Sequence, residues 1–151
     1  MVPVQAYAAG GPSAPVVVIV SACGMPVRPA EAWIRRLAAG HRVLTWESRG
    51  LLGDVPADFD GASGVAAQAG DPLAVMDHVT VSSAHVAGLC GGAVISLVAA
   101  AARPDRIASM SPWHGDFELG DDALKTDHQR NLQGLTSLAT GRGSVRPGSR
   151  R

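Results

Sequence analysis

A continuous run of β-branched residues, Val16 to Val20, most constrains how this chain can fold. A strand with one face in water alternates apolar and polar side chains, whereas this run has no polar position. Such a strand is buried on both faces, which is typical of a parallel sheet with helices packed on either side. Aromatic residues make up only 4% of the chain, so Val, Ala, Leu and Ile must form the core. The run therefore predicts an α/β protein.

Helices and strands are predicted to alternate after this run. Apolar residues at helical or strand spacing, bounded by Gly and Pro, predict strands over 41–47, 85–89 and 106–111 and helices over 29–39, 71–79 and 93–103. Asp71 followed by Pro72 is predicted to be the cap and first residue of its helix. The alternation predicts right-handed crossovers and a mostly parallel sheet with helices on both faces.

The remaining segments carry weaker patterns. Residues 48–70 are rich in Gly, Ala and Asp and are predicted to be mostly loop, and 121–138 are predicted to form an amphipathic helix. Residues 140–151 contain only Gly, Ser, Thr, Val, Pro and Arg, which predicts a basic, disordered tail. We therefore expect one domain over residues 1–139, followed by this tail.

The sequence Gly88-Leu-Cys-Gly-Gly92 lies between a predicted strand and a predicted helix. It fits the Gly-x-nucleophile-x-Gly pattern of a nucleophile elbow, with Cys90 as the nucleophile. The small residues let strand and helix backbones pass close together, which exposes the middle residue above the sheet. The helix N-terminus there favours an anion, whether a thiolate or a developing oxyanion. The backbone N–H of Gly91 is a candidate donor to that oxyanion.

With these motifs, residues 15–120 resemble the α/β-hydrolase fold family. The elbow, Ser21-Ala-Cys-Gly-Met-Pro26, Glu47-Ser-Arg-Gly50, Asp71-Pro-Leu-Ala-Val-Met-Asp-His78 and Arg103-Pro-Asp-Arg-Ile107 carry the resemblance. It implies a partial α/β-hydrolase domain and a second oxyanion N–H from Cys23. It also implies acyl-transfer chemistry, as in esterases or thioesterases, on a small-molecule or carrier-bound acyl substrate with no cofactor. The chain departs from the family where His-Gly is replaced by Ser21-Ala22.

The base is the missing part of this site. In the family the base His follows the last strand of the sheet, and we expect this chain to end before that strand. Only His114 is predicted to lie at the same sheet edge as Cys90, with Asp116 two residues further on. We therefore interpret His114 and Asp116 as candidate base and acid, the alternative for His114 being a polar loop residue.

Several other readings remain open. Cys90 can be an inert core thiol, and a strand, Gly-rich turn and helix can form a dinucleotide site, although Cys90 stands where that fingerprint needs Gly. The chain can instead be a truncated, catalytically inactive hydrolase fragment or an interaction protein. Thiol-dependent turnover would mark an enzyme, and capture of a partner without turnover would mark an interaction protein.

The charge distribution and the hydropathy of the sequence exclude several kinds of partner and binding site. Residues 1–129 carry a net charge of −5 and residues 130–151 a net charge of +5, but the basic segment has neither Lys nor an aromatic residue to stack on a base. We therefore expect no nucleic-acid partner. No apolar run approaches the length of a membrane span, and the N-terminus lacks the pattern of a secretory signal. The two cysteines do not have the spacing of metal ligands. These features predict a cytoplasmic protein without a membrane or metal site.

Two geometric expectations follow from the family resemblance. The strand order should be 41–47, 16–20, 85–89, 106–111, all parallel. Cys23 and Cys90 would then lie close together past the ends of neighbouring strands, and the strand over 106–111 would be an exposed sheet edge through which the protein self-associates.

Overall fold

The computed structural model describes residues 4–22, 24–49, 64–117 and 121–139. The chain divides into two compact units, residues 1–116 and 117–151, each of which is described by itself. Among the described residues no helix is long and apolar enough to cross a membrane.

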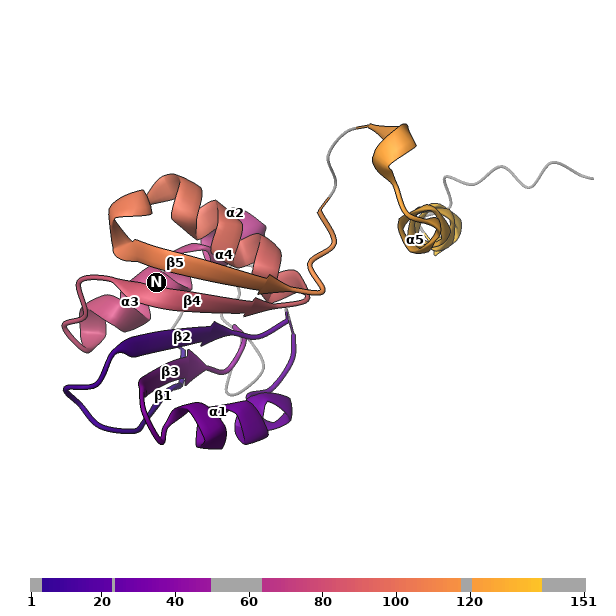
Figure 1. Cartoon of the computed structure of the whole chain (residues 1–151). Helices are drawn as coiled ribbons and strands as arrows, with labels where there is room; N and C mark the ends of the chain where they lie inside the picture. Colours follow the sequence, from indigo (N-terminus) through magenta and orange to yellow (C-terminus); the bar gives the residue numbers. More distant parts are fainter. Residues whose placement is uncertain (1–3, 23, 50–63, 118–120, 140–151) are drawn as a thin grey trace, which may run out of the picture. The chain divides into compact units, whose positions relative to one another are not determined.

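The first unit is built on a five-stranded sheet (Figure 1). The strand order is β1-β3-β2-β4-β5, and every neighbouring pair is parallel except β1 with β3. The strands are β1 (Ala6–Ala9), β2 (Val16–Val20), β3 (Arg42–Trp46), β4 (Ala84–Leu89) and β5 (Ile107–Trp113). The predicted order of the four parallel strands is therefore confirmed. β1 was not predicted, because Ala-Tyr-Ala-Ala has no apolar alternation and is held by backbone pairing with β3.

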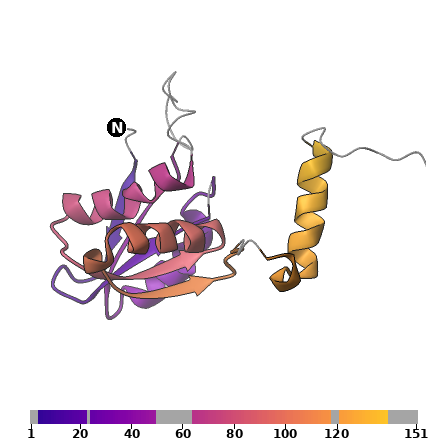
Figure 2. The ribbon, with the colours of Figure 1, turned by 90° about the horizontal axis from the view of Figure 1, so that it is seen from above.

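Helices lie on both faces of this sheet, as predicted (Figure 2). On one face are the short 3-10 helix η1 (Arg28–Ala30) and α1 (Glu31–Leu37). On the other face are α2 (Val65–Gln68), α3 (Gly70–His78) and α4 (Gly91–Ala102), and the 3-10 helix η3 (Pro104–Arg106) leads from α4 to β5.

The β-branched run of β2 supplies both halves of the core. Val18 and Val20 pack with Met76 and Ile95 under α3 and α4, whereas Val17 and Ile19 pack towards α1. Val18 and Ile19 are both fully buried, so successive residues face opposite cores. Their burial confirms that this strand is covered on both sides.

The predicted start of α3 was wrong. Asp71 is not the helix cap: α3 begins at Gly70, and the Asp71 side chain is buried in an ion pair with Arg49. A guanidinium partner inside the fold offers a carboxylate stronger hydrogen bonds than two free N–H groups at a helix end. The predicted loop over 48–70 contains α2, and residues 50–63 lie outside the described residues.

The second unit contains the 3-10 helix η4 (Asp122–Leu124) and α5 (Asp127–Ala139). A capping box starts α5: the Thr126 N–H donates to Gln129 Oε1 (2.8 Å), and the Gln129 N–H donates to Thr126 Oγ1 (3.2 Å). The helix predicted over 121–138 therefore starts later than expected. Residues 140–151 lie outside the described residues, so the domain boundary at 139 and the tail stay predictions.

Glycines set how closely α4 approaches the sheet. A Cβ added at Gly92 would lie 2.1 Å from the Val20 carbonyl oxygen and 2.6 Å from that of Ser21. A Cβ added at Gly88 would lie 2.6 Å from the Ala93 Cα. These are backbone atoms, so a larger residue at either position must push the start of α4 away from β2 and β4.

We predict that Gly92→Ala destabilises the protein by roughly 1–3 kcal/mol, because the added methyl group overlaps the end of β2. Gly70→Ala is the matched control: it is also a first-turn helical glycine, and nothing lies within 4 Å of its added Cβ. Urea denaturation of both variants checks the prediction. Equal stabilities would show that α4 does not depend on this close approach.

We predict that the protein self-associates through β5, which ends the described sheet and carries no charged residue. A lysine on this edge strand, as in Ala108→Lys, should lower the concentration-dependent mass seen by light scattering. Ala39→Lys adds the same charge at an exposed site away from β5 and should leave that mass unchanged. A wild-type monomer at high concentration would contradict the prediction.

Candidate active site

Cys90 occupies a strained turn between the end of β4 and the start of α4. Its backbone has φ 53° and ψ −120°, a region that side-chain-bearing residues rarely adopt and that costs roughly 1–3 kcal/mol. The residue is exposed, unlike the core positions that precede it in β4. The structure thus presents a thiol to solvent at a point where the surrounding fold holds the backbone in an unfavourable conformation.

Hydrogen bonds fix both backbone groups of Cys90. Its N–H donates to the Trp113 carbonyl oxygen on β5 (2.8 Å), and its carbonyl accepts from the Ala93 N–H (2.9 Å). One turn later the buried Ser96 hydroxyl donates to the Gly92 carbonyl oxygen (2.6 Å). These bonds tie the turn to β5 on one side and to α4 on the other.

His114 directly follows Trp113, the residue whose carbonyl oxygen accepts from the Cys90 N–H. Leu89 pairs with Trp113 in the β4–β5 register, so the next residues, Cys90 and His114, leave the sheet at the same edge. His114 also has a positive φ, 51°, and is exposed, as is Asp116. The structure therefore brings the segments that carry Cys90, His114 and Asp116 to one edge of the sheet.

Of the two candidate oxyanion donors, Gly91 and Cys23, only Gly91 lies among the described residues. Gly91 is the first residue of α4, in the first turn, where N–H groups have no partner within the helix. Cys23 lies outside the described residues, so its distance from Cys90 and its role as a donor stay predictions.

The end of β3 anchors the loop that follows β2, which the sequence analysis did not foresee. The Glu47 carboxylate accepts from the Val27 N–H (2.8 Å) and from the Tyr7 hydroxyl (3.2 Å). The Ser48 hydroxyl makes contacts of 3.1 Å with the Met25 carbonyl oxygen and 3.3 Å with that of Ala22. The motif Glu47-Ser-Arg-Gly50 was noted in the sequence, but nothing there shows that its side chains reach a loop twenty residues earlier.

A second anchor joins β3 to α3. Arg49 Nε donates to both carboxylate oxygens of Asp71, at 2.7 and 2.9 Å, and both side chains are largely buried. The hydrogen bonds to Asp71 raise the pKa of the Arg49 guanidinium, against the opposing effect of desolvation. Removal of either partner would leave a buried charge alone, at a cost of about 3–5 kcal/mol.

Among the residues with described positions, no three His, Cys, Asp or Glu side chains cluster as a metal site would require.

Comparison with curated proteins found relatives of about half of this chain. No family model matches the chain. The RutD protein of Variovorax paradoxus, named as a carbamate hydrolase, is 34% identical over 49% of this chain and 27% of its own length. The acetyltransferase component of the acetoin cleaving system of Pseudomonas putida is 37% identical over 47% of this chain and 20% of its own length. The chain thus spans about a quarter of these relatives.

Solved structures cover more of the chain. An α/β hydrolase from Sphaerobacter thermophilus matches 93% of this chain and 52% of its own, with 28% identity and a TM-score of 0.64. A carboxylesterase from Nitrososphaera gargenis matches 93% and 50%, with 17% identity and a TM-score of 0.67. An epoxide hydrolase from Vigna radiata matches 85% and 42%, with 20% identity and a TM-score of 0.68. The mostly parallel sheet and its covering helices have the α/β-hydrolase fold.

Proposed function

We propose that the protein is an acyl-transfer hydrolase, an esterase or thioesterase, with Cys90 as its nucleophile. The observation that carries this proposal is the exposed thiol at φ 53° between a strand and a helix N-terminus. A buried structural cysteine needs neither exposure nor backbone strain, and strain of this kind concentrates at functional sites.

The fold alone does not select this reaction. Structures with the same architecture include an epoxide hydrolase, whose substrate has no acyl carbon, beside a carboxylesterase. The carboxylesterase and the relative named as a carbamate hydrolase support attack on a carbonyl carbon. A thiolate is well suited to that attack, because it is strongly nucleophilic near neutral pH.

The proposed chemistry has two steps. The Cys90 thiol gives its proton to a base, its sulfur bonds to the carbonyl carbon, and the N–H groups of Gly91 and Cys23 bind the resulting oxyanion. The oxyanion collapses, the alcohol or thiol leaves with a proton, and the acyl group remains on Cys90 as a thioester. Water then adds to this thioester, loses a proton to the base, and releases the acid and the free Cys90 thiol.

His114 is the proposed base, with Asp116 as the acid that orients it. Support comes from the backbone: the Trp113 carbonyl that binds the Cys90 N–H belongs to the residue before His114. Both His114 and Asp116 are exposed, so packing does not hold the imidazole in one orientation. We therefore expect acylation of Cys90 to be faster than hydrolysis of the acyl-enzyme, because hydrolysis needs a well-placed base to activate water.

We predict a burst of leaving group, equal at most to the enzyme concentration, when the protein meets an activated thioester, followed by slow turnover. Cys90→Ala should abolish the burst, because no nucleophile remains. Rapid mixing with a chromogenic thioester measures its amplitude. Cys90→Ser is a second variant that keeps the size and exposure of the side chain while weakening the nucleophile.

A burst that persists in Cys90→Ala would end the nucleophile proposal. No burst in the folded wild-type protein would favour the inactive fragment or the interaction protein instead.

We predict that His114→Ala slows the burst by about 10²-fold, the lower end of the range for general acid–base catalysis, without lowering its amplitude. His78→Ala is the control, because His78 is exposed and ends α3, shortly before the start of β4, at the opposite end of the strands from Cys90. The pH dependence of the burst rate in the wild type and in His114→Ala separates a base from a structural role. Identical rate–pH profiles would remove His114 from the mechanism.

A further inference from the structure

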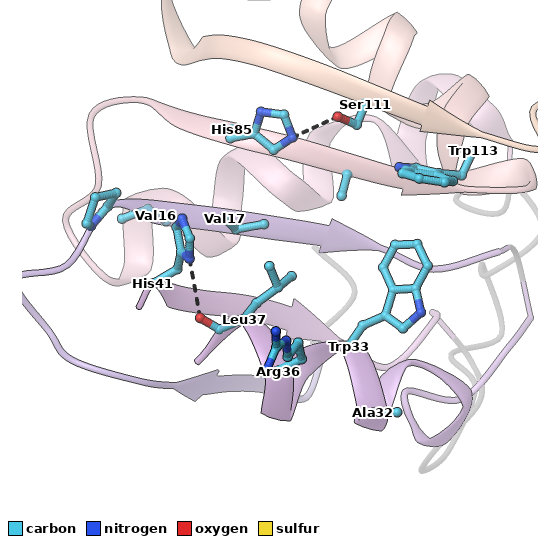
Figure 3. A pocket seen from close by; sticks show the side chains of 12 residues that line it. Val16, Val17, Ala32, Trp33, Arg36, Leu37, His41, His85, Ser111 and Trp113 are labelled. Carbon is cyan, nitrogen blue, oxygen red and sulfur yellow. Dashed lines mark hydrogen bonds between the residues drawn. The ribbon is translucent and has the colours of Figure 1, made fainter. Parts of the chain in front are cut away.

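A groove of about 810 Å³ lies beside α1 on the face of the sheet opposite α4 (Figure 3). Val16 and Val17 of β2 and Ala87 of β4 line its floor. Residues of α1 form one wall and residues of β5 the other. Cys90 does not line the groove, but Trp113, whose carbonyl oxygen accepts from the Cys90 N–H, does, so the groove ends next to the proposed acyl-transfer site.

The end of the groove towards the carboxyl ends of the strands is aromatic. Trp33 and Trp113 meet edge to face there, with ring centroids 5.3 Å apart and an angle of 83° between their planes. The two residues are 39% and 47% exposed. Large aromatic surface left in water is a favourable contact for an apolar ligand, since its burial contributes roughly 25 cal/mol per Å².

The polar groups of the groove suit an anion. Arg36, His41 and His85 line it, and no Asp or Glu is among the described residues that do. In the part of the chain that the structure describes, Arg36 has no carboxylate partner, whereas the neighbouring Arg35 pairs with Glu31 at 2.7 Å. His85 is held in place by β5: its Nδ1 lies 2.6 Å from Ser109 Oγ and its Nε2 lies 3.0 Å from Ser111 Oγ.

From this arrangement we propose that the groove binds a straight-chain carboxylate. Its carboxylate pairs with Arg36, and its alkyl chain lies along Val17 and Ala87 towards the two tryptophans. The volume falls within the range of small-molecule sites, about 300–1,000 Å³, and is small for a helix of about 10 Å diameter. Trp113, at one end of the groove, pairs with Leu89 in the sheet, so the groove spans the strand length from His85 to Leu89, roughly 13 Å, which lets an extended alkyl chain of medium length lie flat.

Dodecanoate binding, followed by quenching of tryptophan fluorescence and by calorimetry, tests the proposal. We expect saturable 1:1 binding, and weaker binding of dodecanol, which has the same chain without the charge. Arg36→Gln should weaken dodecanoate binding about three- to fivefold, the effect of losing one exposed ion pair. Arg35→Gln is the matched control on the same helix and should leave the affinity unchanged.

Two variants fill the groove from opposite walls: Ser111→Phe from β5 and Ala32→Phe from α1. Each should abolish binding while thermal unfolding shows an intact fold, and the second serves if the first disturbs β5. Unchanged affinity in a folded, filled variant would overturn the proposal, as would equal affinities for dodecanoate and dodecanol. Cys90→Ala should bind dodecanoate like the wild type, so this test does not depend on the acyl-transfer proposal.

Discussion

The close approach of α4 to the ends of β2 and β4 is the constraint on which the rest of the site depends. Without side chains at Gly88 and Gly92, the backbone of the helix start lies against the Val20 carbonyl and against β4. The turn between them is then too tight for ordinary backbone angles, and Cys90 takes φ 53°. The exposure of its thiol follows from this packing, because the strained residue is the one that leaves the sheet plane.

The same sheet edge gathers the other polar groups because the strands are parallel. Cys90 and His114 leave β4 and β5 side by side, and the carbonyl of Trp113 locks the two turns together. At the ends of β2 and β3, Glu47 and Ser48 fix the loop after β2, and the Arg49–Asp71 pair fixes the end of β3 to α3. The edge is thus held from both sides by groups with no place in the chemistry.

Local sequence patterns predicted most of the fold. The unbroken Val16–Val20 run, the helical spacing and the Gly-x-Cys-x-Gly turn are local signals, and the structure confirms the parallel strand order. The signals that failed depend on tertiary partners. β1 forms only by pairing with β3. Asp71 does not cap its helix, because its carboxylate binds Arg49, 22 residues earlier. The anchoring by Glu47 could not be predicted for the same reason, and the groove beside α1 depends on which part of the sheet the helices leave uncovered.

The central claim is that Cys90, and no other side chain, receives the acyl group. The most direct measurement is acid quenching after one equivalent of an activated thioester, followed by proteolysis and mass spectrometry of the peptides. The account predicts one acyl adduct, on the peptide that contains Cys90, and its absence in Cys90→Ala. An adduct on Cys23 or another side chain, with Cys90 unmodified, would contradict it.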